Sequence, residues 1–257
     1  MRSLKLDEFL IPNIKILKTK NSHDQTVLDF RHSRKFNQES NNIKALSMPD
    51  VDYFFKLIKK NKTSSKEIKN KIKFNTKKNW SKLYKRNVFG HEMLFHVQKI
   101  LKNKNKIVLD LCSGNGENEE IFYQLGAKKV ILSDYRSDNA HLLIDVHNLP
   151  FRPNSFDLIF CSQALEHWYN PYEALRQINL ILKPGGSFVC SVSFMERWHG
   201  NSFFHCSPHA IFSLCQNNNL SIEDFWLSGE PINDFLISRT IFKSRKINSL
   251  ILAISDF

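Results

Sequence analysis

The sequence predicts an α/β fold built around a mostly parallel sheet, and two patterns support this. From Ile107 onward, short apolar segments rich in Val, Ile, Leu and Phe alternate with segments whose apolar residues recur at helical spacing. The first apolar segment, 107–111, is followed by Gly114 and Gly116 and then by a short helical segment, 117–125. A strand, a glycine loop and a helix in this order form the first unit of a nucleotide-binding sheet, in which the ligand lies at the carboxyl end of the strand.

The glycine loop is the feature around which the other elements are arranged. Glycine has no Cβ, so Gly114 and Gly116 let the chain turn sharply and let a ligand lie against the backbone. The helical segment after the loop begins with three glutamates, which suit the positive end of a helix, and Gly126 is placed to end it. Asp110, near the end of the strand, can order the loop by accepting hydrogen bonds from its backbone N–H groups.

The remaining elements follow from the same kinds of pattern. Asn170, Pro171 and Glu173 suit the N-cap and the first turn of a helix. This helix is expected to end near Leu182, where Pro184-Gly185-Gly186 returns the chain to the sheet. The prediction is completed by helices over 50–59, 87–102 and 208–217, and by strands over 129–134, 141–146, 154–160, 187–194, 221–227 and 249–256, the last of them antiparallel.

Carboxylates mark the expected ligand edge of the sheet. The sequence lacks the Gly-x-x-x-x-Gly-Lys pattern of a phosphate-binding loop, which fits a ligand without phosphates. Asp134 ends a predicted strand and lies 18 residues after Gly116, a spacing at which an acid can accept both ribose hydroxyls. Asp145, in the segment 141–146, can accept a hydrogen bond from an adenine amino group.

Six short motifs stand in sequence order. They are Val108-Leu109-Asp110-x-x-x-Gly114-x-Gly116, Asp134, Asp145-x-x-x-Leu149-Pro150-Phe151, Phe156-Asp157-Leu158-Ile159, Glu166-His167 and Leu182-Lys183-Pro184-Gly185-Gly186. Together they resemble the class I S-adenosylmethionine-dependent methyltransferases, in the broad subgroup that includes quinone-biosynthesis methyltransferases. The resemblance covers roughly residues 88 to 230.

The resemblance implies a Rossmann-like methyltransferase fold, with a mostly parallel seven-stranded sheet, helices on both faces and S-adenosylmethionine as cofactor. It implies cofactor contacts from Asp110, Cys112, Gly114, Gly116, Asp134, Asp145, Val146 and Ser162. Two features depart from the family. The family usually has glycine where Cys112 stands, so the Cβ of this cysteine is expected to crowd the loop. Only ten residues separate Asp134 from Asp145, so the helix between these strands is expected to be reduced or absent.

Positive charge is concentrated before the sheet. The chain of 257 residues has a formal net charge of +12, yet residues 1–106 hold 26 Lys and Arg against 9 Asp and Glu, whereas residues 107–257 hold 11 against 16. The charge distribution therefore predicts a basic N-terminal extension over 1–87, partly helical and loop-rich over 18–47, and the resemblance implies a methyltransferase domain over 88–257. The charge is either compositional drift or a surface for an acidic partner such as nucleic acid, anionic lipid or a phosphorylated carrier.

Cysteine usage and hydropathy favour a cytoplasmic protein. The five cysteines include no Cys-x-x-Cys pair and are interpreted as reduced thiols. The N-terminus has no apolar segment of the kind that a secretory signal needs. No segment approaches the ~18 apolar residues of a membrane span, so no transmembrane helix is expected. Peripheral contact with a membrane and the oligomeric state stay open.

Histidines after the fifth predicted sheet strand are the candidates for acceptor chemistry. Methyl transfer mainly needs the nucleophile, the methyl carbon and the sulfur in one line, and a base is needed only when the acceptor carries a proton of high pKa. His199 and His205 are the candidate bases; the alternative is that their segment only packs against the extension. Glu166-His167 is a less favoured candidate for proton transfer. Zinc-ligand types recur over 199–209, but their spacing matches no compact site, and no metal is predicted.

The sequence favours O-methylation of a small molecule or of a glycan or lipid-linked intermediate. The segment 194–209 is loosely similar to methyltransferases of cell-envelope polysaccharide biosynthesis. One alternative is an RNA methyltransferase that grips phosphates with its Lys-rich extension, although no recognised RNA-binding module and no Asn-Pro-Pro-Tyr-type motif after the 154–160 strand are present. The other is a non-catalytic cofactor-binding subunit, which the presence of Gly114, Gly116 and Asp134 disfavours.

Overall fold

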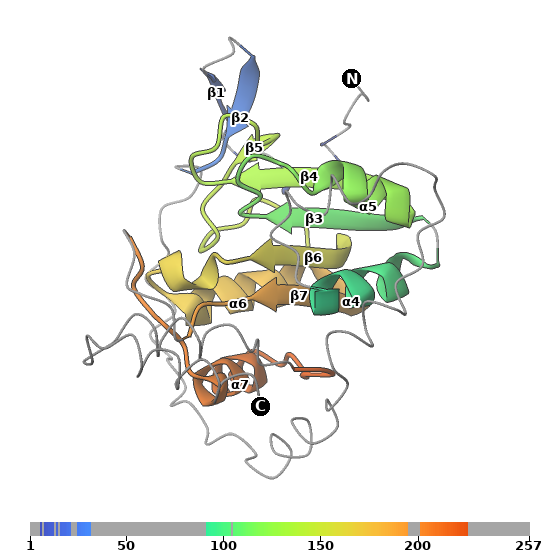
Figure 1. Ribbon diagram of the computed structural model, residues 1–257. Helices are drawn as coiled ribbons and strands as arrows, with labels where there is room; N and C mark the ends of the chain where they lie inside the picture. Colours follow the sequence, from blue (N-terminus) through green and yellow to red (C-terminus); the bar gives the residue numbers. More distant parts are fainter. Residues whose placement is uncertain are drawn as a thin grey trace, which may run out of the picture.

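Seven strands form one sheet in the part of the chain that the structure describes. The computed structural model describes residues 6, 8–12, 14, 16–21, 25–31, 91–103, 105–194 and 201–225. The strand order is β1-β2-β5-β4-β3-β6-β7 (Figure 1). Every neighbouring pair is parallel except β1 with β2. The strands are β1 (Leu17–Lys20), β2 (Thr26–Asp29), β3 (Lys106–Leu111), β4 (Ala127–Asp134), β5 (Leu142–Leu143), β6 (Phe156–Ser162) and β7 (Leu182–Ser191).

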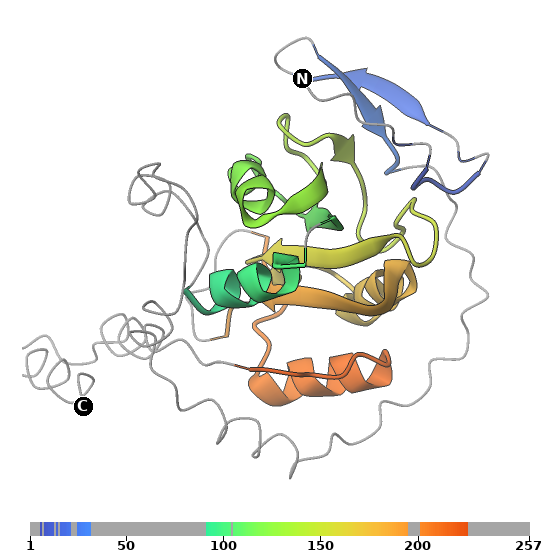
Figure 2. The same cartoon turned by 90° about the vertical axis from the view of Figure 1, so that its right-hand side faces the viewer.

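Helices cover both faces of this sheet. One apolar cluster joins α4 (His91–Leu101) and α5 (Glu119–Leu125) to side chains such as Val108 and Val130. The other joins α6 (Pro171–Ile181) and α7 (Pro208–Asn217) to side chains such as Leu109 and Ile159. Successive side chains of a strand point to opposite faces, so Val108 and Leu109 serve the two clusters. Figure 2 shows α4 and α5 on one side of the sheet and α6 on the other. The predicted fold class is confirmed.

Several local predictions are confirmed by the helix ends. Gly126 adopts φ 109° and its N–H donates to the carbonyls of Phe122 and Tyr123, which ends α5. The side chain of Asn170 accepts from the N–H of Glu173 at 3.1 Å, and Pro171 opens α6. Between Asp134 and Asp145 the chain contains only the two residues of β5 and no helix, as the short spacing predicts.

The predictions for the N-terminal extension and for the sixth strand need correction. The described part of the stretch predicted as loop, 18–47, contains the hairpin β1–β2, and β2 pairs with β5. The prediction that all seven strands lie within 88–257 is therefore wrong, and β1 supplies the antiparallel pair. Residues 221–225 form no strand; Ile222 and Phe225 pack on Phe212 of α7 instead. The predicted helix 50–59 and strand 249–256 lie outside the described residues.

The parallel strands bring the candidate site residues to one edge of the sheet. The carboxyl ends of β3, β4, β5, β6 and β7 lie along the same side of the sheet because these strands are parallel. Residues that follow each strand therefore gather at that edge, where ligands of open α/β sheets bind. Among the described residues, no helix combines the length and the hydropathy of a membrane-crossing segment.

Candidate functional site

The glycine loop after β3 leaves room for a ligand at its first glycine. Gly114 and Gly116 have φ of 54° and 72°, which L side chains rarely adopt. A Cβ at Gly116 would lie 2.8 Å from Leu132 Cδ1, so the end of that side chain would have to shift, and the positive φ strains any other residue at this position. A Cβ at Gly114 would meet nothing within 4 Å. Open space above an exposed backbone turn fits a cofactor that lies against the loop.

Cys112 adopts the conformation that the family's glycine would adopt easily. Its φ is 59°, in the left-handed region, which costs a residue with a Cβ about 1 kcal/mol or more. A hydrogen bond with the thiol of Cys112, together with burial, raises the pKa of Cys161 well above its ordinary value. The strain at Cys112 therefore lies in its backbone, and its thiol contacts Cys161 of β6. The crowding expected from its Cβ stays a prediction.

Asp110 has a different partner from the one that the sequence suggested. Its carboxylate Oδ2 accepts a hydrogen bond from Asn118 Nδ2 at 3.5 Å, and the side chain is almost fully buried. Burial, opposed by the Asn118 bond and reinforced by the neighbouring Asp134 and Glu119, raises the pKa of Asp110 to about 8. The Asp110 carboxyl therefore contacts Asn118, the residue before the first turn of α5. The carboxylate that accepts a hydrogen bond from a glycine-loop N–H is that of Asp134.

Raised pH is expected to destabilise the protein through Asp110. The folded-state pKa of about 8 lies above the ordinary value of 3.8. The stability that this buried neutral carboxyl contributes is present below the unfolded-state pKa and is lost as pH rises through the folded-state pKa. Between pH 6 and 8 the wild type should lose about 1 kcal/mol per pH unit relative to Asp110→Asn. Thermal unfolding of both proteins over this range measures the difference, and parallel curves would contradict it.

Asp134 is held by three backbone N–H groups. Oδ2 accepts from Gly114 at 3.0 Å, and Oδ1 accepts from Arg136 at 2.8 Å and from Ser137 at 3.0 Å. An ionised carboxylate has about four acceptor positions, so this set fixes its orientation and leaves roughly one position unused. Two ribose hydroxyls would use that position and share or displace the Gly114 contact. The sequence correctly placed this acid beside the glycine loop.

Asp145 is fixed by a histidine that the sequence analysis did not single out. Oδ1 of Asp145 accepts from the N–H of His147 at 2.9 Å and contacts His147 Nδ1 at 2.6 Å. His147 Nε2 accepts from the N–H of Asn170 at 3.2 Å, which places the ring proton on Nδ1. The ring is buried and stacks on Tyr169, with 3.7 Å between ring centroids. Burial raises the pKa of Asp145, but the His147 bonds outweigh it and the pKa is lowered.

The other two predicted cofactor residues, Val146 and Ser162, are less accessible than Gly114. Val146 is buried in the turn after Asp145. Ser162, the last residue of β6, has its Oγ 3.1 Å from Ser191 Oγ at the end of β7. Both residues lie at the carboxyl edge of the sheet. Val146 precedes His147, which contacts Asp145, and Ser162 contacts Ser191, which contacts Gln163.

A polar network lies beyond β6 and β7, on the side away from Asp134. Ser193 Oγ lies 2.9 Å from Glu166 Oε1 and 3.0 Å from Gln163 Oε1. Glu166 is only 1% exposed, and its Oε2 has no hydrogen-bond partner in the described part of the chain. The N–H groups of Phe203 and Phe204 donate to the Glu166 carbonyl at 2.6 and 3.2 Å, while both phenyl side chains are exposed.

The structure describes one of the two predicted catalytic histidines, His205. His205 is half-buried and directly follows Phe204, whose backbone N–H donates to the Glu166 carbonyl. His199 lies outside the described residues. In the ranges that the structure describes, no group of three His, Cys, Asp or Glu side chains is arranged to hold a metal ion.

Comparison with known proteins identifies the family. A family model described as a methyltransferase domain matches residues 84–222, more than half of the chain. The chain belongs to this methyltransferase family. It is an S-adenosylmethionine-dependent methyltransferase, and S-adenosylmethionine is its cofactor. The subgroup is left broad by the match.

The curated relatives of this methyltransferase act on different substrates by name. An uncharacterized protein of Methanocaldococcus jannaschii is 27% identical over 170 residues, 60% of this chain and 72% of that protein. A demethylmenaquinone methyltransferase of Paenarthrobacter aurescens is 33% identical over 32% of this chain and 36% of its own length. A tRNA U34 carboxymethyltransferase of Nautilia profundicola is 23% identical over 52% and 58%. The chain spans less than two thirds of both named enzymes.

Two solved methyltransferase structures are similar to this chain. An S-adenosylmethionine-dependent methyltransferase from Mesorhizobium loti is 24% identical, with a TM-score of 0.34 over 39% of this chain and 53% of that chain. A putative sarcosine dimethylglycine methyltransferase from Galdieria sulphuraria is 16% identical, with a TM-score of 0.47 over 64% and 77%.

Three thiols of this methyltransferase are poor nucleophiles. All five cysteines are free. Burial raises the pKa of Cys190 and of Cys215 to about 12, and burial with the nearby Glu166 raises that of Cys206. Because the thiolate is the reactive form, these side chains stay inert at neutral pH. Polar side chains, and not thiols, are therefore the groups available for proton transfer at the carboxyl edge.

Proposed function

We propose that this methyltransferase methylates oxygen on a small molecule, or on a glycan or lipid-linked intermediate. The buried carboxylate of Glu166 carries the proposal, because its Oε2 lacks a hydrogen-bond partner among the described residues. An acceptor hydroxyl that displaces the groups covering this buried oxygen would supply the missing donor. The backbone N–H groups of Phe203 and Phe204 donate to the Glu166 carbonyl, and their exposed phenyl side chains offer the apolar contact that lines small-molecule sites.

Cofactor binding is assigned to the glycine loop and two acids. S-adenosylmethionine, when bound, supplies an electrophilic methyl group on a sulfonium. Gly114 and Gly116 let it approach the backbone, Asp134 accepts from its ribose hydroxyls and Asp145 accepts from its adenine amino group. Asp110 and Cys112 shape the loop beneath it, and Val146 and Ser162 complete the proposed set of contacts.

Proton transfer is assigned to a histidine. A hydroxyl acceptor must lose its proton during transfer, and histidine is the side chain whose ordinary pKa lies closest to neutral pH. The backbone contact of the preceding Phe204 with the Glu166 carbonyl supports this role for His205, and His199 is proposed as the alternative base. Both lie in the segment between β7 and α7.

The role of Glu166 can be tested by an isosteric change. Glu166→Gln keeps Oε1 for Ser193 but replaces Oε2 by an N–H donor. It should lower methyl incorporation into the acid-soluble fraction of a cell extract by about tenfold, the effect of one lost hydrogen bond to the acceptor. Affinity for S-adenosylmethionine, measured by calorimetry, should not change. Glu223→Gln, at an exposed carboxylate after α7, is the control. Unchanged incorporation in Glu166→Gln would remove the observation on which the proposal stands.

An RNA substrate is the second candidate. Residues 1–106 carry 26 Lys and Arg against 9 Asp and Glu, and one relative is named as a tRNA enzyme. Binding through phosphates would fall steeply with added salt. The residues from 107 onward carry excess negative charge, which is unfavourable for a polyanion lying across the site.

The cellular setting and the division of the chain are also proposals. Five free thiols support a reducing, cytoplasmic location. The chain is proposed to divide into an extension over 1–87 and a catalytic domain over 88–257, because positive charge is concentrated in the first part. Residues 17–29 of the extension nevertheless belong to the sheet. Docking of an acidic carrier or of an anionic membrane surface on the extension would bring the acceptor to the site.

A further inference from the structure

The N-terminal hairpin reaches the loop that follows Asp134. Arg31 Nη1 donates to the carbonyl of Tyr135 at 3.1 Å, just beyond the end of β2. Asn21 Nδ2, in the turn between β1 and β2, donates to the carbonyl of Asp138 at 2.7 Å. These two side chains of the hairpin therefore hold both ends of the loop 135–138, from more than 100 residues away in the sequence.

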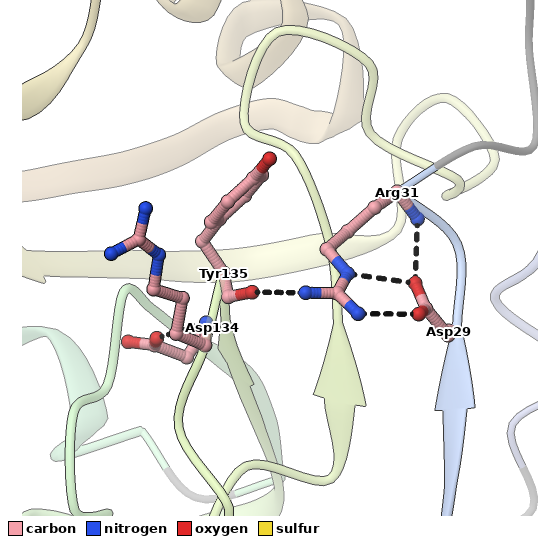
Figure 3. Close-up of polar contacts among 5 residues, drawn as sticks. Asp29, Arg31, Asp134 and Tyr135 are labelled. Carbon is pink, nitrogen blue, oxygen red and sulfur yellow. Dashed lines mark hydrogen bonds and ion pairs between the residues drawn. The ribbon is translucent and has the colours of Figure 1, made fainter. Parts of the chain in front are cut away.

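Arg31 is itself fixed in one orientation. Its Nε and Nη2 donate to Asp29 Oδ1 and Oδ2 at 3.0 and 2.6 Å, and its backbone N–H donates to Asp29 Oδ1 at 3.0 Å. The Asp29 side chain is only 8% exposed, so its carboxylate is shielded from water, whereas the Arg31 side chain is 26% exposed. A bidentate pair holds the planar guanidinium rigidly. Figure 3 shows this group with one edge on Asp29 and the remaining nitrogen on Tyr135.

The loop that Arg31 holds is the same loop that orients Asp134. Oδ1 of Asp134 accepts from the N–H groups of Arg136 and Ser137, which lie between the two carbonyls held by the hairpin. A shift of this loop would turn the carboxylate, because two of its three backbone donors would move with it. Through this loop, the Arg31 side chain influences the orientation of the Asp134 carboxylate.

We propose that Arg31 is a positioning residue for cofactor binding. It holds the loop 135–138 so that the Asp134 carboxylate stays directed at the ribose of S-adenosylmethionine, and the hairpin at 17–31 is in this sense part of the cofactor site. The inference rests on the proposed ribose role of Asp134. A hairpin that only covers the edge of β5 would make the same strand pairs without needing this guanidinium.

Binding of two ligands separates positioning from general stability. In the full chain, Arg31→Met removes the donors and keeps the length of the side chain. It should weaken S-adenosylhomocysteine by about 5- to 10-fold in calorimetry, the effect of a lost hydrogen bond from a charged group. The 2′,3′-dideoxy analogue of S-adenosylhomocysteine lacks the ribose hydroxyls and should bind equally to wild type and variant. Lys18→Met, at an exposed lysine of β1, should change neither affinity. Asn21→Ala is a second variant if Arg31→Met folds poorly.

A double-mutant cycle with Asp134 decides the mechanism. In the Asp134→Ala background, Arg31→Met should cause no further loss of S-adenosylhomocysteine affinity, since the residue acts through that carboxylate. Equal losses for both ligands, or losses that multiply in the double variant, would overturn the inference while leaving the ribose assignment intact. An Asp134→Ala protein with unchanged affinity would overturn both.

Discussion

Replacing His205 by alanine is expected to lower turnover by about 10²- to 10⁴-fold, the range that a general base contributes. The same loss is expected for His199→Ala if that histidine is the base. Affinity for S-adenosylmethionine should stay nearly constant in both, because a group that acts on the acceptor proton contributes in the transition state and not to cofactor binding. Initial rates at saturating cofactor, together with calorimetry, measure the two quantities separately.

The control for this result is His209→Ala. His209 is exposed in the first turn of α7 and close in sequence to His205, but it has no assigned role. Its variant should retain wild-type turnover. Equal turnover in the His199, His205 and His209 variants would remove base catalysis by histidine from the mechanism and leave the cofactor site untouched.

Asp134→Ala is expected to weaken S-adenosylmethionine binding by about 10- to 100-fold, on the order of 1–3 kcal/mol. Two ribose hydroxyls lose charge-assisted acceptors, and the turn after β4 loses the carboxylate that caps it. Calorimetry gives the affinity. Asp138→Ala, at an exposed carboxylate of the same loop, should bind as the wild type does.

Two outcomes would contradict the assignment of Asp134. Unchanged affinity in Asp134→Ala would show that the ribose is held elsewhere. Preference of the wild type for a dinucleotide over S-adenosylmethionine would place the acid in a different kind of nucleotide site, since an acid at this spacing also binds the ribose of dinucleotides.

The parallel part of the fold was predictable because its signals are local. Buried apolar strands, the αL glycine at Gly126 and the cap at Asn170 each act within a few residues, and the structure confirms them. The hairpin β1–β2 was missed for the opposite reason. Its strands have four residues each and are partly polar, and β2 is held by pairing with β5, more than 100 residues later. No local pattern reports such a contact.

The candidate site divides in the same way. Gly114 and Asp134 follow from motif spacing, and the structure joins them by a hydrogen bond. The partner of Asp110 could not be predicted, because it depends on how deeply the side chain is buried under the loop. His147 had a weak signal, a donor two residues after an aspartate, which is the spacing of an Asx turn. Arg31 had none, since its contact with Tyr135 is created by the tertiary fold.

The fate of a labelled methyl group tests the proposed function most directly. Purified protein, S-adenosylmethionine with a ¹³C-labelled methyl group and an extract of the cells that produce the protein are incubated, and the extract is separated into small-molecule, lipid, glycan and RNA fractions. The proposed function predicts a new O-methyl signal in a small-molecule, glycan or lipid fraction, absent with the Asp134→Ala protein. Label found only in tRNA or rRNA, or cofactor binding without any transfer, would contradict it.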